Sequence, residues 1–275
     1  MSHTLIDIGV NLVHRRFAPD REAVLRRAQA AGVAAMIVTG TRVAESRAAL
    51  RLARAHPGVL WCTAGIHPHS ARELDDESMS QLRELATDSP VVAIGECGLD
   101  YDRDFSPRPL QRACFERQLD LAAELNLPVF LHERKAHADF QAILREHRPQ
   151  LAGVVVHCFT GSRAELESYL ELDCHVGLTG WVTDARRAGP VREAMATLPR
   201  DRVMLETDAP FLLPKTAPRS SGRNEPSHLP LVLEAVAELM ELDSHTLASL
   251  ATSNTERFFG LRVGQLTAAS HARSP

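Results

Sequence analysis

The chain has 275 residues, of which 44% are apolar and 24% are charged, a composition that is typical of globular proteins and excludes a largely disordered chain. The formal net charge of −4 excludes a general electrostatic attraction to polyanions, so any binding of nucleic acid must depend on a local patch. No apolar stretch approaches the roughly 20 residues of a membrane span, and the five cysteines form no Cys-x-x-Cys pair. The N-terminus also lacks a signal-peptide pattern, so we predict a soluble cytoplasmic protein without a membrane partner.

Apolar runs of strand length alternate with longer helical patterns along the chain. The eight predicted strands span residues 4–10, 34–39, 60–64, 91–94, 128–131, 153–156, 175–178 and 203–205. Helical patterns occur between them, as at 21–31 and 110–125, and follow the last strand at 229–240 and 245–258. This alternation is typical of repeated βα units around a parallel sheet, so we predict an α/β fold, a (β/α)8 TIM barrel.

The predicted barrel accounts for almost the whole chain. Residues 1–264 are expected to form one domain, because barrels of this type commonly reach this length. Residues 265–275 are mostly polar and small and are expected to be a flexible C-terminal tail. A proline-rich polar segment at 208–226 follows the eighth strand, and a loop of this length in a compact fold is usually functional or disordered.

Five of the apolar runs end in a residue that can bind a metal or carry a proton: Asp7, Glu96, His132, His157 and Asp208. In a (β/α)8 barrel the C-terminal ends of the strands converge on one face, so these residues are predicted to form one site. A single histidine in such a place is more often structural than a ligand. Two histidines with several carboxylates, however, supply the mixed nitrogen and oxygen ligands of Mg²⁺, Mn²⁺ or Zn²⁺ hydrolytic centres.

Residues in the loops offer further candidates. Asp208 is placed as a general base or a metal ligand, or alternatively as the cap of the turn that follows it. His67, in Gly-Ile-His67-Pro-His69, either contacts a phosphate or caps a structural turn. Trp181 is placed to stack on a base or to pack under its loop. The loops after the fifth and eighth strands carry four cations: Arg134, Lys215, Arg219 and Arg223. Together these cations could form a rim for phosphates, although a single charge on a loop is usually only solvated.

A series of motifs runs in order along nearly the whole chain. They are Asp7-Ile-Gly-Val-Asn11, Ala-Gly-Ile-His67-Pro-His69, Ile-Gly-Glu96-Cys-Gly-Leu-Asp100, Pro-Val-Phe-Leu-His132, His157-Cys-Phe-Thr-Gly161, Glu-Thr-Asp208-Ala-Pro and Arg223-Asn-Glu-Pro226. With these motifs the chain resembles the TatD family of metal-dependent nucleases, and most closely the branch that carries the family's name.

The resemblance implies a barrel of the metal-dependent hydrolase type that cleaves phosphodiester bonds with Mg²⁺, or with Mn²⁺ as a substitute. It further implies a 3′→5′ exonuclease that acts on the 3′ ends of single-stranded DNA or RNA, in DNA repair or RNA turnover, and we expect a monomer. The positions that match the family's metal site are Glu96, His132, His157 and Asp208. Asp208 and Glu96 are expected to be the catalytic carboxylates, and the expected substrate contacts are His67, Arg134, Arg223 and Asn11.

The first strand departs from the family pattern. Most members begin with Asp-x-His-x-His, whereas this chain reads Asp7-Ile-Gly9-Val-Asn11. Both first-strand histidines are therefore absent, and an asparagine replaces an imidazole ligand only weakly. The resemblance leaves open whether the site holds one metal ion or two.

Two other functions compete with a nuclease. The same barrel and ligand types also serve amidohydrolases and phosphotriesterases that act on small molecules, although the absence of the first-strand histidines counts against a zinc pair. The second competitor is a non-catalytic barrel that binds nucleic acid or a protein. The intact set of strand-end carboxylates and histidines counts against that reading.

Overall fold

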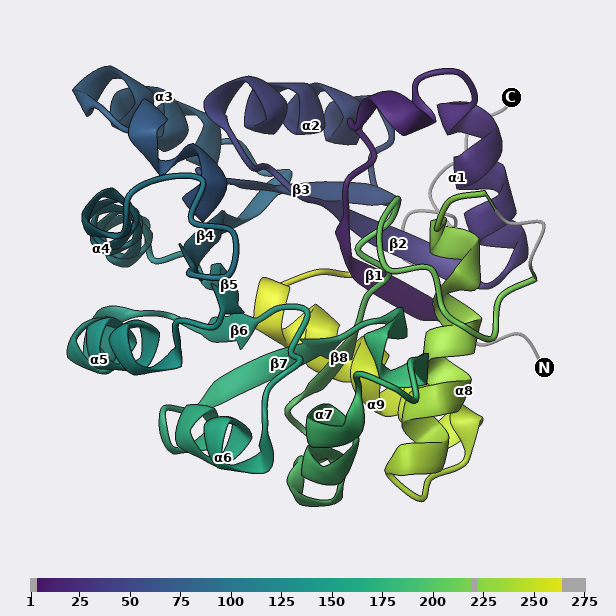
Figure 1. The fold of residues 1–275 in the computed structure, drawn as a ribbon. Coiled ribbons are helices and arrows are strands. Elements are labelled where there is room, and N and C mark those ends of the chain that lie inside the picture. The colour runs from purple at the N-terminus through teal and green to yellow at the C-terminus, as the bar shows by residue number, and fades with distance from the viewer. Residues whose placement is uncertain (1–3, 219–221, 264–275) are drawn as a thin grey trace, which may run out of the picture.

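The computed structural model describes residues 4–218 and 222–263, and within these ranges eight parallel strands form a barrel (Figure 1). The strands follow one another around the barrel in chain order. Their bounds are β1 Leu5–Val10, β2 Val33–Val38, β3 Leu60–Ala64, β4 Val91–Asp100, β5 Val129–Arg134, β6 Val154–Val156, β7 Cys174–Leu178 and β8 Val203–Leu205.

Helices alternate with the strands and surround the barrel on its outer side (Figure 1). The α-helices are α1 Arg21–Ala30, α2 Val43–Ala55, α3 Asp76–Ala86, α4 Arg108–Leu125, α5 His137–His147, α6 Arg163–Glu171, α7 Gly189–Ala194, α8 Leu229–Leu239 and α9 Ser244–Phe259. Short 3₁₀ helices lie in the loops: η1 Arg15–Phe17, η2 Pro68–Glu73, η3 Arg148–Gln150, η4 Gly180–Thr183, η5 Met195–Thr197 and η6 Pro226–His228. The predicted alternation of strands and helices is therefore confirmed.

Local signals in the sequence fix several helix ends. α3 begins at a capping box in which the Asp75 side chain accepts from the backbone N–H of Ser78. α6 begins at a second capping box, formed by Ser162 and Glu165. α4 ends at Asn126, which adopts the left-handed conformation that asparagine tolerates better than most residues.

The barrel closes where the first and last strands meet. The Asn11 N–H donates to the carbonyl oxygen of Ala209 at 2.8 Å, and the Asp208 N–H donates to that of Gly9 at 2.8 Å. These bonds continue the parallel pairing from β8 to β1 beyond the last residue of β8. The (β/α)8 prediction is thus confirmed, and residues that are far apart in sequence meet at the C-terminal ends of the strands.

Two apolar layers hold the barrel together. The larger layer lies between the strands and the surrounding helices. The smaller one fills the barrel interior with inward-facing side chains such as Ile8, Phe130 and Met204. Phe259 and Leu261, at and beyond the end of α9, pack onto this inner cluster and close the N-terminal end of the barrel. Polar side chains are consequently left to the opposite, C-terminal end.

β4 is longer than the sequence pattern indicated. The prediction ended this strand at residue 94, because two glycines follow, whereas the strand continues to Asp100. Gly95 and Gly98 have φ values of +139° and +140°, and a Cβ on either would lie within 2.2 Å of the backbone oxygen of Phe130 or His132. The glycines therefore permit close pairing with β5 and do not end the strand.

Some sequence features lie outside the described residues, namely the predicted tail at 265–275 and the loop residue Arg219. Within the ranges that are described, no helix combines the length and the apolar character that a membrane crossing requires.

Candidate active site

A cavity of about 950 Å³ opens at the C-terminal end of the barrel. Its lining includes Asn11 after β1, His67 after β3, Glu96 in β4 and Asp208 after β8. Of the five strand-end residues that the sequence singled out, Glu96 and Asp208 line this cavity, and His132 and His157 contact Glu96. Asp7 does not line the cavity, because its buried carboxylate accepts hydrogen bonds from the N–H and the hydroxyl of Thr207.

Glu96 is the centre of a cluster of imidazoles. Its Oε1 lies 2.8 Å from His157 Nε2, 3.0 Å from His132 Nδ1 and 3.2 Å from His67 Nε2. Burial opposes ionisation of this carboxyl, but His157 and His67 together with two hydrogen bonds outweigh it and hold the pKa of Glu96 well below its usual range. The site therefore contains a buried carboxylate anion surrounded by three histidines.

This cluster fits a divalent cation. The ligand atoms of His67, Glu96 and His132 all lie within 4.8 Å of one another. The second ring nitrogen of His132, Nε2, is buried and forms no hydrogen bond, although Asp100 Oδ2 lies 3.4 Å from it. Imidazole nitrogens and a carboxylate oxygen are the ligands of hydrolytic Mn²⁺, Zn²⁺ and related ions. His67, expected from the sequence to contact substrate, thus lies among the candidate metal ligands.

Glu206 is a member of the site that the sequence analysis did not assign. Its Oε2 lies 3.3 Å from His157 Nδ1, and its Oε1 accepts a hydrogen bond from the backbone N–H of Cys158. A carboxylate on the far nitrogen of a histidine fixes the orientation of the ring and leaves the other nitrogen free for a ligand. The signal was present in Glu206-Thr-Asp208, since residues two apart at a strand end point to the same side.

Two glycines make room for Glu206. A Cβ on Gly9 would lie 2.3 Å from Glu206 Oε2, and a Cβ on Gly177 would lie 2.5 Å from Oε1. Gly9 replaces a histidine of the first-strand motif, and the carboxylate of Glu206 therefore packs directly against its backbone. Glu206 is fully buried, so its contacts to His157 and Cys158 have no competition from bulk water.

Asp208 and Asn11 face each other across the closure of the barrel. Asn11 Nδ2 donates a hydrogen bond of 3.0 Å to Asp208 Oδ1. Burial is the main reason that the pKa of Asp208 rises to about 8, and the nearby carboxylates of Glu96 and Glu206 raise it further against the opposing effect of His157. Asn11 lines the cavity and orients this carboxyl group, and its contact with substrate stays a prediction.

The positively charged side chains of the loops differ in whether a carboxylate of the protein already binds them. Arg134 lines the cavity, but its Nε is 3.1 Å from Asp102 Oδ2, and Lys135 binds the same carboxylate. Arg103 also lines the cavity, is exposed, and its guanidinium has no ion pair or hydrogen bond among the described residues. Arg103 does not stand out in the sequence, because a single arginine in a polar loop forms no distinguishing pattern.

Arg223 does not line this cavity. Its guanidinium binds Asp20 at 2.7 Å and Glu225 at 2.9 Å, and it lies over the ring of Phe17 at 4.7 Å from the centroid. The same arginine borders a separate pocket of about 520 Å³ near α1. Lys215 likewise lies outside the cavity lining, 3.9 Å from Asp184.

Trp181 has the packing role that its sequence position allowed, and its stacking on a base stays a prediction. Its side chain lines the cavity but also packs against the apolar layer between strands and helices. The Arg187 guanidinium covers its ring at 4.3 Å from the centroid. The indole is therefore a fixed wall of the cavity with one face already occupied.

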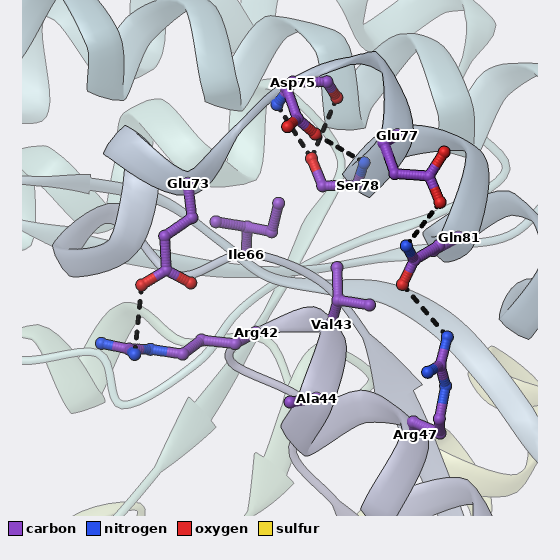
Figure 2. A pocket seen from close by; sticks show the side chains of 10 residues that line it. All are labelled: Arg42, Val43, Ala44, Arg47, Ile66, Glu73, Asp75, Glu77, Ser78 and Gln81. Carbon is purple, nitrogen blue, oxygen red and sulfur yellow. Dashed lines mark hydrogen bonds and ion pairs between the residues drawn. The ribbon is translucent and has the colours of Figure 1, made fainter.

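A third pocket, of about 410 Å³, lies between α2 and α3 and shares Arg42 with the large cavity (Figure 2). Its polar side chains bind one another: Arg42 pairs with Glu73 at 3.1 Å, Arg47 donates to Gln81 at 3.1 Å, and Gln81 donates to Glu77 at 2.7 Å. Figure 2 shows that the Arg42–Glu73 and Arg47–Gln81 pairs join different elements across the pocket, whereas the Gln81–Glu77 pair lies within α3. The histidine and carboxylate cluster lies in the larger cavity, which is therefore the candidate active site.

The eight-stranded barrel and the buried carboxylate–imidazole cluster at its C-terminal end define a barrel hydrolase. Comparison with known proteins narrows this class. Residues 6–260 match the model of the family described as TatD related DNase, and the chain belongs to that family.

Curated relatives are similar over nearly their full length. Proteins named 3′-5′ ssDNA/RNA exonuclease TatD from Pantoea vagans and Erwinia tasmaniensis are each 51% identical to this chain over 259 residues, which is 94% of the chain and 100% of the relative. The crystal structure of YjjV, a TatD homologue from Escherichia coli K12, is 32% identical with a TM-score of 0.85, covering 95% of this chain and 100% of that one.

More distant structures share the fold alone. An organophosphorus hydrolase from Deinococcus radiodurans aligns with a TM-score of 0.64 at 12% identity, over 93% of both chains. The small-molecule hydrolases considered from the sequence thus have the same barrel, and sequence similarity separates this chain from them.

Proposed function

We propose that this protein is a metal-dependent 3′→5′ exonuclease that hydrolyses the phosphodiester bonds of single-stranded DNA and RNA. The observation that carries the proposal is the convergence of His67, His132 and His157 on Glu96 at the mouth of a barrel whose sequence is 51% identical to proteins of that name. A phosphodiester is negatively charged and reacts slowly with water. A divalent cation held by this cluster would offset the negative charge and activate a water molecule for the attack.

The proposed metal ligands are Glu96, His132, His157 and Asp208, to which the geometry adds His67. Mg²⁺ is the proposed ion, with Mn²⁺ as a substitute. When bound, such an ion would polarise the scissile phosphate and lower the pKa of a nearby water molecule.

The protein's own residues would position and accept the proton of that water. Asp208, held by Asn11 Nδ2, is proposed as the general base. Because burial raises the pKa of Asp208 to about 8, the ionised form of this carboxyl group is a stronger base than an ordinary aspartate. Glu206 would keep the His157 ring in its orientation by the contact to Nδ1.

Phosphate groups of the strand are proposed to meet Arg103 and Arg134 at the rim of the cavity. Guanidinium groups bind phosphates with charge-assisted hydrogen bonds. Because the net charge of the chain is negative, such local contacts have to supply the attraction.

The proposed setting is the cytoplasm, where the five free cysteines would stay reduced. We propose a monomer with a role in DNA repair or RNA turnover, since both processes expose single-stranded 3′ ends.

The decisive test is digestion of a 5′-labelled single-stranded oligonucleotide with Mg²⁺, with Mn²⁺ and with EDTA. The wild-type protein should give a metal-dependent ladder that shortens from the 3′ end. His157→Ala should abolish it, whereas His56→Ala, at a histidine on the surface near α2, should cleave like wild type. Hydrolysis of small esters or amides without any cleavage of oligonucleotides would overturn the proposal in favour of the small-molecule hydrolase.

A further inference from the structure

Exposed aromatic side chains mark one side of the active-site mouth. Three large hydrophobic side chains of the described residues are exposed: Phe105 by 60%, Leu110 by 44% and Phe211 by 47%. Of these, Phe211 lines the cavity that contains Glu96 and Asp208. An exposed apolar side chain is common on protein surfaces, but Phe211 lines the cavity that contains the carboxylate–imidazole cluster, where a substrate could reach it.

The backbone of Phe211 is fixed to the catalytic residues. Its N–H donates to the carbonyl oxygen of Asp208 at 3.0 Å, so the phenyl ring lies one tight turn away from the proposed base. The preceding carbonyl, that of Pro210, accepts from Arg16 Nη1 at 3.3 Å and from the Asn224 N–H at 3.4 Å. The segment is therefore held from both sides although the ring itself is open to solvent.

A second loop supports the ring. The imidazole of His14 lies edge-on to Phe211, with the ring centroids 5.5 Å apart and the planes at 72°. His14 is itself held, because its Nδ1 accepts from the backbone N–H of Arg16. His14 also lines the cavity, so the two rings form one aromatic wall at the closure of β8 onto β1.

Trp181, the other aromatic residue at the cavity, is less suited to bind a flat ligand. Arg187 already covers its ring, and its Nε1 is buried without a hydrogen-bond partner. Phe211 therefore presents the more open aromatic surface beside the metal cluster.

We propose that Phe211 stacks on the base of an unpaired nucleotide next to the scissile phosphate and thereby selects single-stranded substrate. The proposal rests on the proposed exonuclease function and adds to it the residue that recognises the base. Stacking on an aromatic side chain tolerates every base, because each base has a π-face. Bases inside a duplex have both faces covered by their neighbours, so a paired strand cannot use this contact without unstacking.

The test compares Phe211→Ala, Phe211→Trp and the control Leu110→Ala, an exposed side chain on α4 that does not line the cavity. Each variant digests a normal single-stranded oligonucleotide and matched strands with an abasic residue at the terminal or the penultimate 3′ position. Equilibrium binding of the same strands is measured in EDTA by fluorescence anisotropy, which does not depend on cleavage.

Phe211→Ala should raise KM on the order of ten-fold with little change in kcat, because stacking stabilises the bound substrate and the transition state alike. Phe211→Trp and Leu110→Ala should keep the wild-type KM. The wild-type protein should bind one of the abasic strands more weakly than the normal strand, and Phe211→Ala should lose this difference.

Equal KM and equal binding for wild type and Phe211→Ala, or an abasic penalty that persists in that variant, would overturn the stacking role while leaving the exonuclease intact. Absence of metal-dependent cleavage by the wild-type protein would instead refute the proposed function. Even then, the binding measurements in EDTA would decide whether Phe211 contacts a base.

Discussion

Gly9 lies so close to Glu206 that a Cβ on residue 9 would be 2.3 Å from the carboxylate Oε2. Glu206 in turn holds His157, one of the three imidazoles around Glu96. Gly9, which stands where most family members have a histidine, therefore leaves the space that the buried carboxylate of Glu206 occupies. Glu206 directly follows β8, which neighbours the first strand where the barrel closes.

Gly9→Ala is expected to lower the free energy of unfolding by about 2 kcal/mol, a typical cost of forcing extra atoms into a packed interior. It should also lower kcat, because displacement of Glu206 releases His157 Nδ1. The matched control is Gly189→Ala, where a Cβ meets nothing within 4 Å and stability should change little. Urea unfolding and oligonucleotide digestion measure the two effects. Equal stability of Gly9→Ala and Gly189→Ala would contradict the predicted clash.

Divalent cations are expected to stabilise the protein against heat. At a metal concentration 100-fold above the dissociation constant the gain is about 2.7 kcal/mol, or roughly 5 °C in Tm for a chain of this size. Because imidazole ligands favour Mn²⁺ over Mg²⁺, the shift should appear at lower Mn²⁺ concentration. Differential scanning fluorimetry of wild type and Glu96→Gln tests this. A shift that survives in Glu96→Gln would place the ion elsewhere.

Arg103 is expected to contribute more to substrate binding than Arg134, because Arg134 is already paired with Asp102. Arg103→Ala should raise KM several-fold and reduce the dependence of log KM on log salt by about 0.7, the effect of one phosphate contact on a single strand. The control is Arg83→Ala, at a half-exposed arginine of α3 paired with Glu124. A larger effect from Arg134→Ala than from Arg103→Ala would reverse the ranking.

Acid is expected to destabilise the fold partly through His175, which lies in β7 against the ring of Phe258. Burial, with a smaller effect of Arg202, lowers the pKa of His175 to about 4. Below about pH 6.5 the unfolded chain takes up a proton at this residue and the folded chain does not, so its contribution to stability falls as the pH drops towards 4. Urea unfolding between pH 7 and pH 5 should show a shallower decline for His175→Leu than for wild type. An equal pH dependence of stability in wild type and His175→Leu would contradict this prediction, because it would mean that His175 is protonated equally well in the folded and the unfolded chain.

Much of the fold could be predicted because buried strands leave a plain signal. The predicted strands at 60–64 and 203–205 agree with β3 and β8 at both ends. β4 was predicted too short, because Gly95 and Gly98 resemble a turn when their partners on β5 are unknown. The length of β4 depends on how closely its backbone approaches that of β5. This distance cannot be predicted from the sequence of either strand alone.

The residues of the carboxylate–imidazole cluster could be predicted from the sequence, whereas the residues that orient the cluster or border the cavity were harder to predict. Strand-end position alone singled out Glu96, His132 and His157, and the structure brings them together. Glu206 was not assigned, since its role in orienting His157 becomes visible only when the residues that follow β6 and β8 are brought together at the end of the barrel, across the intervening β7. The difference between Arg103 and Arg134 depends on which of them Asp102 binds, and no sequence pattern reports such pairing.

The contact between Asn11 and Asp208 joins residues that are 197 positions apart. A chain whose synthesis has not passed the eighth strand therefore lacks Asp208, the proposed general base, and has no closed barrel. This order of synthesis matters for a nuclease that digests RNA, because the messenger RNA from which the protein is translated is itself a single-stranded RNA that the enzyme could cleave. We therefore expect a growing chain to be inactive towards RNA until the residues of the eighth strand and of the loop after it have been added.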